Sequence, residues 1–195
     1  MERATRHLVI ADAAIAKRGL LIDIALVLGF ACLTAASAQI SFWIGPVPIT
    51  GQTLAVLLSG AILGSSRGAM SQLTYLAIGA TGIPFWFAAG GPPGIARLAG
   101  PTGGYLLGFV AAAFVTGWLA EKGQDRRIWT AMLAMLAGNA VIYLFGLPWL
   151  AHFVPRDSIL KLGLYPFIPG DLIKIAIASL TLRGGWLVVK HLKNC

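Results

Sequence analysis

The sequence has few charged residues, and this scarcity excludes an ordinary water-soluble domain. Only 11% of its 195 residues are Asp, Glu, Lys or Arg, whereas 57% are hydrophobic and the mean hydropathy is +0.80. About a quarter of the residues in a typical soluble domain are charged, because polar side chains must cover its surface. The excess apolar surface must therefore face lipid. This composition predicts a single membrane domain.

Residues that carry chemistry are equally scarce. Cysteine occurs only at Cys32 and Cys195, and the histidines are scattered, so neither a disulfide framework nor a metal-ligand spacing is present. The sequence contains no Ser-centred nucleophile motif and no GxxxxGK[ST] phosphate loop. These absences argue against an enzyme and predict no metal and no cofactor. Any active transport must draw its energy from another subunit or from a gradient.

Acidic residues are the scarcest charged class, and the formal net charge is +8. The basic residues lie at the ends of apolar segments rather than in one run or on one face, so we expect no nucleic-acid partner. Placing the N-terminus in the cytoplasm leaves only Arg97, Arg156 and Lys161 in external loops. The other basic residues considered then lie inside: Arg3, Arg6, Lys17, Arg18, Arg67, Lys122, Arg126, Arg127, Lys190 and Lys193. Both termini are therefore predicted to be cytoplasmic.

Apolar stretches long enough to span a bilayer, which takes about 20 residues, recur along the chain. Four have this length: Leu20–Ile40, Gly103–Ala120, Ile128–Ala151 and Ile168–Val189. Turn formers and a charge at 64–68 interrupt another apolar run and predict a hairpin between two helices, roughly 53–64 and 68–87. The predicted fold is all-α, with six transmembrane helices in a membrane domain of residues 19–195. It follows a cytoplasmic segment, 1–18, in which residues 4–17 are expected to form an amphipathic helix on the inner surface.

The start of the chain allows a second interpretation. Lys17-Arg18, the apolar run and Ala36-Ser37-Ala38 resemble the three regions of a secretory signal peptide. Asp23 interrupts the run, and several further spans follow, so an uncleaved first helix is favoured. Mass spectrometry of the intact N-terminus distinguishes the two.

Polar side chains at membrane depth are costly, so each is a candidate functional residue. Asp171 and Lys174 share one helix face, as do Asn139 and Tyr143. Arg97 is the only charge in a loop rich in glycine and proline. Structural alternatives stay open: an ion pair at a helix start, an interhelical hydrogen bond from Asn139, and an arginine in water.

Two alanines in the first long helix are candidates for a different kind of contact. Ala31 and Ala35 lie one turn apart. Small residues at this spacing allow a second helix to approach closely, either inside the bundle or on a partner protein.

Several separated motifs resemble the BioY family, the biotin-specific substrate-binding (S) components of energy-coupling factor (ECF) transporters. They are Pro46–Leu58 (PVPITGQTLAVLL), Tyr75-Leu76, Gly79, Gly82-Ile83-Pro84 and Gly100–Leu106 (GPTGGYL). The likeness runs from about Gln39 to Ala178. It implies a six-helix protein of the cytoplasmic membrane that binds biotin from outside and delivers it inward.

The resemblance also implies partners and site residues. In such systems transport is driven by a transmembrane coupling protein and two cytoplasmic ATPases, although members of the family are also thought to mediate uptake alone. Ala31 and Ala35 resemble the motif that meets the coupling protein. An S component for another small vitamin, or a membrane scaffold without transport activity, are the alternative functions. The family's ligand contacts correspond here to Arg97, Asn139, Tyr143, Asp171 and Lys174, with Gln52 and Tyr105 as weaker assignments.

Overall fold

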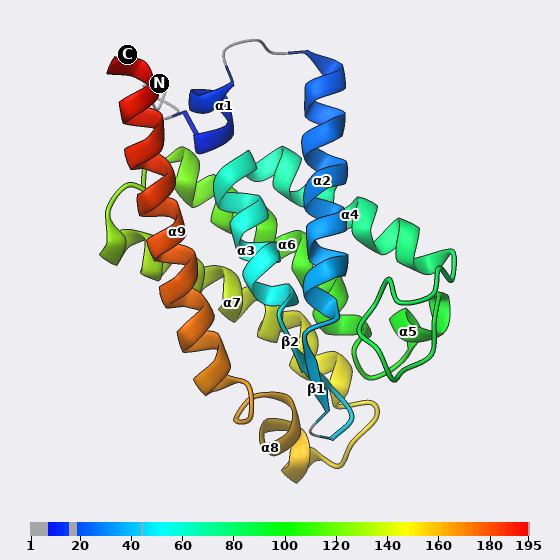
Figure 1. Cartoon of the computed structure of the whole chain (residues 1–195). Helices are drawn as coiled ribbons and strands as arrows, with labels where there is room; N and C mark the ends of the chain where they lie inside the picture. The colour runs from blue at the N-terminus through cyan, green and yellow to red at the C-terminus, as the bar shows by residue number, and fades with distance from the viewer. Residues whose placement is uncertain (1–7, 16–18, 44, 195) are drawn as a thin grey trace, which may run out of the picture.

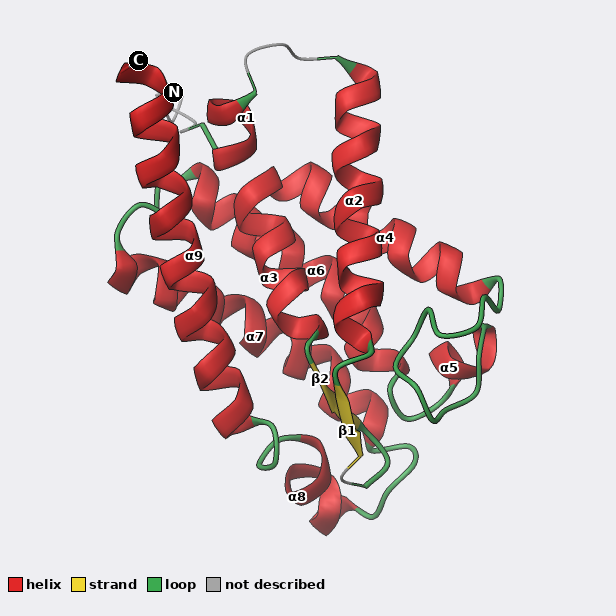
Figure 2. Cartoon of the chain, viewed as in Figure 1, coloured by secondary structure: helices red, strands yellow, loops and turns green. Residues whose placement is uncertain are grey.

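The computed structural model describes residues 8–15, 19–43 and 45–194, and the chain is mostly helical (Figures 1 and 2). The short helix α1 and the end of α9 lie at one end of the bundle, and a β-hairpin and α8 lie at the other (Figure 1). The elements are α1 Ile10–Ala14, α2 Leu20–Ala38, β1 Ser41–Trp43, β2 Pro48–Thr50, α3 Gln52–Leu63, α4 Ser65–Ala80, α5 Ile95–Ala99, α6 Gly103–Glu121, α7 Ile128–Leu150, the 3-10 turn η1 Arg156–Ser158, α8 Ile159–Gly163 and α9 Ile168–Asn194.

Helices occupy all six stretches in which spans were predicted. Four helical stretches of the described chain are long and apolar enough to cross a membrane: Leu20–Ala38, Gly103–Glu121, Ile128–Leu150 and Arg156–Leu192. The protein is thus a multi-pass membrane protein by length and composition. Helices α3 and α4 are shorter, so a count of six transmembrane helices stays a prediction. The cytoplasmic placement of both termini also stays a prediction, and Arg3, Arg6, Lys17 and Arg18 lie outside the described residues.

The predicted break between α3 and α4 is present but tighter than expected. Gly64 alone makes the turn with a φ of +89°, a conformation that only glycine adopts readily, and α4 begins at the next residue. At its other end α4 stops at Ala80 rather than 87. Gly82 has a φ of +88° and Pro84 follows, so the helix cannot continue.

The all-α prediction is wrong in one detail, because Ser41–Trp43 and Pro48–Thr50 pair as two short antiparallel strands. Ser41 pairs with Thr50, Phe42 with Ile49, and Trp43 with Pro48. Aromatic and β-branched residues favour strands. Proline has no N–H group to donate to a neighbouring strand, but in a two-stranded sheet each strand has only one neighbour, so Pro48 is tolerated. The strands are only three residues long, too short for an alternating pattern to be recognised in the sequence.

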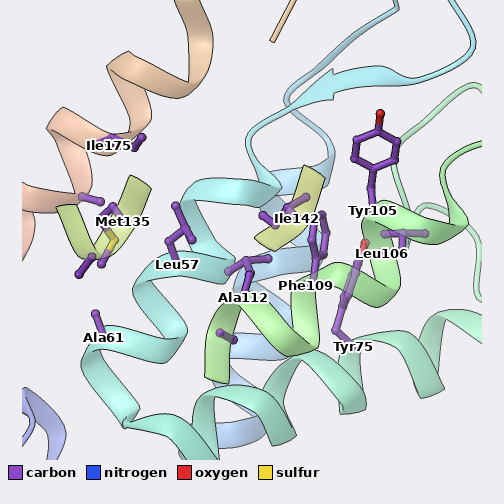
Figure 3. Close-up of a cluster of buried hydrophobic side chains, with 14 of the residues drawn as sticks. Leu57, Ala61, Tyr75, Tyr105, Leu106, Phe109, Ala112, Met135, Ile142 and Ile175 are labelled. Carbon is purple, nitrogen blue, oxygen red and sulfur yellow. The ribbon is translucent and has the colours of Figure 1, made fainter. Parts of the chain in front are cut away.

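Helix α6 lies at the centre of the bundle and packs against α3, α4 and α7. Close approach depends on glycine, since a Cβ atom on Gly117 would collide with the backbone of Gly64 and Ser65 at the α3–α4 turn. The central core combines Leu57, Phe109, Ala112, Met135 and Ile142 from α3, α6 and α7 (Figure 3).

Helix α2 packs mainly on α4 and α3, and a polar network joins the three. The side-chain amide of Gln72 donates to Thr34 Oγ1 at 3.2 Å and to Ser59 Oγ at 3.0 Å, and all three side chains are buried. Ala31 and Ala35 are 0% and 7% exposed, so they lie inside the bundle rather than on its surface. Neither residue is exposed in this arrangement, and a role for them in contact with a partner protein stays a prediction.

Residues 8–15 pack on the bundle rather than apart from it. The helical part is Ile10–Ala14, and Val9 and Ala11 are 2% and 6% exposed. The rest of the predicted amphipathic helix, 4–7 and 16–17, lies outside the described residues. A boundary at 18/19 between two segments stays a prediction, but α1 is in contact with α3 and α9.

Candidate ligand-binding site

An open, narrow cavity lies where β2 meets α3, α6, α7 and α9. It encloses about 490 Å³ of empty space when its mouth is included. The wall is mainly apolar with a few polar groups, a pattern typical of small-molecule sites. The lining residues are Val47, Pro48, Thr50, Gln52, Thr53, Thr102, Tyr105, Leu106, Phe109, Asn139, Ile142, Tyr143, Phe167, Asp171 and Lys174.

The cavity brings together six of the seven residues that the sequence singled out as ligand contacts: Gln52, Tyr105, Asn139, Tyr143, Asp171 and Lys174. They come from α3, α6, α7 and α9, so residues more than a hundred positions apart converge on one place. Arg97 is not among the lining residues. Sequence reasoning did not single out Thr53, which follows Gln52 in the same motif and also lines the cavity.

Asp171 is the centre of the polar wall. It lies in the first turn of α9, where the helix dipole favours a negative charge, and it is 5% exposed. The Tyr143 hydroxyl donates to Asp171 Oδ2, and Lys174 Nζ lies 3.3 Å from Asp171 Oδ1. Lys174 also donates to Thr53 Oγ1 at 3.0 Å. The expected ion pair therefore exists, and both of its members face the cavity.

Asn139 differs from these residues in lacking a partner for its carbonyl oxygen. It lies midway along α7 and is 5% exposed, and no described group donates a hydrogen bond to its Oδ1 atom. An interhelical hydrogen bond, the structural alternative for Asn139, is therefore not accepted by this oxygen in the described chain. A buried acceptor without a donor destabilises the free protein, and a ligand N–H can satisfy it.

An aromatic wall faces the polar groups. Tyr105 meets Tyr143 edge to face at 6.2 Å between ring centroids and stacks on Phe167 at 6.4 Å. The Tyr105 hydroxyl donates to the Gly163 carbonyl at 2.8 Å, which ties this wall to α8. Tyr105 and Phe109 project from one side of α6 near Ile142 (Figure 3). The arrangement suits a flat apolar ring system beside hydrogen-bonding groups.

Gln52 links the cavity to the loop that follows α4. Its side-chain amide donates to the Tyr75 hydroxyl and accepts from the Thr50 hydroxyl at 2.8 Å. Tyr75 stacks on Trp86, whose indole donates back to the Tyr75 carbonyl at 2.8 Å. One wall of the cavity is thus held in place by loop residues.

Arg97 lies in α5 and fastens this loop to the β-hairpin. Its guanidinium donates to the Ala88 carbonyl and stands 5.5 Å from the ring of Trp43, which itself donates to Ala89 O at 2.8 Å. Burial lowers the pKa of the Arg97 guanidinium, while the nearby Tyr75 opposes that shift. A ligand contact by Arg97 stays a prediction that depends on movement of this loop.

The fold and the cavity define a class of protein: a multi-pass membrane protein whose helical bundle encloses a cavity of small-molecule size. The chain matches the BioY family over residues 7–191 and belongs to it. The match begins before Gln39 and ends after Ala178, so it includes α1 and most of α9.

Known relatives agree with this membership. A probable biotin transporter BioY of Pyrococcus horikoshii is 44% identical over 156 residues, which cover 80% of this chain and 91% of the relative. The biotin transporter BioY of Thermotoga maritima is 39% identical over 153 residues, with 77% and 88% covered. The crystal structure of an S-component for biotin from an ECF-type ABC transporter superposes with a TM-score of 0.72 at 26% identity, covering 84% of this chain and 89% of the other.

Proposed function

We propose that this protein binds biotin from the external side and takes it up across the cytoplasmic membrane as the S component of an ECF-type transporter. Family membership and relatives named as biotin transporters support the substrate. The observation that carries the proposal is the convergence of Asn139, Tyr143, Asp171 and Lys174 on one cavity with an aromatic wall. The role is transport rather than catalysis.

The chemistry of biotin fits these groups. Its ureido ring offers two N–H donors and one carbonyl, its bicycle is apolar, and its side chain ends in a carboxylate. Asn139 and Asp171 are acceptors for the ureido N–H groups, and the ring system packs on Tyr105 and Phe167. Lys174 is a cationic donor for the ureido carbonyl or the carboxylate. Arg97 is retained as a second candidate for the carboxylate.

The number of transmembrane helices and the orientation of the chain in the membrane are part of the same proposal. Six transmembrane helices with both termini in the cytoplasm place the β-hairpin and the cavity on the external side. The distribution of Lys and Arg supports this orientation. A short helix such as α3 is tolerated in a membrane where neighbouring helices shield its ends from lipid and form hydrogen bonds with its free backbone groups.

A transmembrane coupling protein and two cytoplasmic ATPases are the proposed partners. Because Ala31 and Ala35 are buried, we propose that the opposite face of α2 meets the coupling protein. That face carries the exposed small residues Ala25, Gly29 and Ala36, and a Cβ atom on Gly29 would have no described heavy atom within 4 Å. Small residues of this kind allow close helix–helix contact.

Calorimetry on the purified protein tests the substrate directly. Biotin is expected to release heat with a defined stoichiometry, and desthiobiotin, thiamine and riboflavin serve as comparison ligands. Heat with another vitamin but none with biotin would transfer the assignment to that vitamin. A membrane scaffold is tested separately, because it would not restore growth on trace biotin to cells that require external biotin.

A further inference from the structure

The short helix α1 contacts α3 and α9 at the opposite end of the bundle from the β-hairpin and α8 (Figure 1). Val9 and Ala11 are buried, and Ile10 packs against the hydrophobic core. A helix of five residues does not form alone in water, so its contacts with the bundle hold it in shape. We call residues Leu8–Ala14 the α1 clasp.

Two arginines fasten the α1 clasp to other elements. Arg67 of α4 pairs with Asp12 of the clasp at 2.6 Å and with Asp23 of α2 at 3.0 Å. Arg126, in the turn between α6 and α7, donates to the Leu8 carbonyl at 3.3 Å and stands 4.2 Å from the ring of Trp186 in α9. The clasp is thus in contact with α3, α4, α9 and the turn between α6 and α7.

A glycine of α9 lies directly against the clasp. A Cβ atom on Gly185 would lie 3.1 Å from Ile10 Cδ1, which leaves little room for any side chain there. A Cβ atom on the preceding residue, Gly184, would have no described heavy atom within 4 Å. The chain therefore offers two adjacent glycines in one helix, of which only one faces the clasp.

Helix α9 also carries part of the cavity wall. Asp171 and Lys174 lie near its start, and Gly185 lies fourteen residues after Asp171, or about 21 Å along a continuous helix. In the described chain α9 packs mainly on α7, α3 and the clasp. Because α9 is one continuous helix from Ile168 to Asn194, we expect a change of tilt at Gly185 to shift the carboxylate and the amine near its other end.

We propose that the α1 clasp holds α9 against α3 and so keeps Asp171 and Lys174 in their binding arrangement. Release of the clasp then loosens α9 and lowers the affinity of the cavity for its ligand. This fastening can be reached by solvent, since the side chains of Asp12 and Arg67 are 19% and 22% exposed. The ligand effect rests on the proposed function, whereas the mechanical coupling does not.

The test compares Gly185→Leu with the control Gly184→Leu, which makes the same chemical change on the open side. Hydrogen exchange of residues 168–178 is measured without ligand, and the biotin dissociation rate is measured by competition. Gly185→Leu is expected to accelerate exchange at 168–178 and to raise the dissociation rate at least about fivefold, the lower end of typical coupling between sites. Gly184→Leu is expected to behave as wild type.

A compensating double variant distinguishes the specific contact from a general folding defect. The double variant Ile10→Ala with Gly185→Leu removes the side chain that the new leucine would strike, and both readouts are expected to return to within about twofold of wild type. Equal behaviour of the two single variants would overturn the proposal, as would faster exchange confined to the clasp. If the wild-type protein does not bind biotin, the proposed substrate is wrong. Hydrogen exchange of residues 168–178 still tests whether the clasp acts on α9, because it is measured without ligand.

Discussion

Replacing Asn139 by leucine is expected to have opposite effects on stability and on binding. The change swaps a buried amide for an apolar side chain of similar size and removes the Oδ1 acceptor that has no described donor. An unsatisfied buried polar group costs about 1–3 kcal/mol, so its removal is expected to stabilise the free protein by about 1 kcal/mol after imperfect packing is allowed for.

Binding is expected to weaken in the same variant. If a ligand N–H satisfies Asn139 Oδ1 in the complex, losing this hydrogen bond leaves the ligand donor unpaired and costs about 1–3 kcal/mol, or roughly 5- to 150-fold in Kd. Thermal unfolding without ligand and calorimetry with biotin measure the two effects on the same purified protein.

Thr116→Val provides the matched control for Asn139→Leu. Thr116 is fully buried in α6, its hydroxyl donates to the Ala112 carbonyl at 2.9 Å, and it does not line the cavity. This variant is expected to leave biotin affinity unchanged. A lower unfolding temperature for Asn139→Leu would indicate that the amide joins helices, and a higher one with unchanged affinity would remove Asn139 from the ligand contacts. Either result refutes the reasoning.

Three further predictions follow from individual contacts. Asp171→Asn is expected to weaken biotin binding, measured by calorimetry, more than tenfold, because it removes the charge that orders the donors Tyr143 and Lys174. Asp157→Asn, on the exposed η1 turn, is the control. Ala31→Leu is expected to lower the unfolding temperature, because overpacking a fully buried site reduces the free energy of unfolding by about 1–3 kcal/mol. Gly29→Leu on the open face is expected to leave the unfolding temperature nearly unchanged but to weaken co-purification with the coupling protein. Arg97→Gln is expected to weaken binding of biotin more than that of biotin methyl ester; equal losses would restrict Arg97 to fastening its loop.

The long helices could be predicted because a membrane imposes a strong rule on sequence. A helix that spans a bilayer must be mainly apolar, which makes α2, α6, α7 and α9 visible as long apolar stretches. The same rule identifies rare polar residues such as Asn139 and Asp171 as candidates for a site. Hydropathy does not measure helix ends, so α4 was expected to continue to 87 when Gly82 and Pro84 already stop it.

Other features depend on contacts that the sequence does not encode locally. The spacing of Ala31 and Ala35 places both on one face of a helix, but only the bundle determines whether that face meets α4 or a partner. The position of Arg97 depends on the path of a loop rich in glycine. Docking of α1 depends on Arg67 and Gly185, which are far from it in sequence.

The two main acceptors in the polar wall differ in their hydrogen bonds, and this difference affects which ligand is selected. Asp171 already receives hydrogen bonds from Tyr143 and Lys174, so the direction of its side chain is fixed before a ligand arrives. Asn139 has an acceptor that nothing in the described chain satisfies. A ligand that brings an N–H group to Asn139 removes an existing penalty, whereas one that brings a carbonyl adds a second unpaired acceptor. Selection by the cavity therefore depends on its amide as much as on its charges.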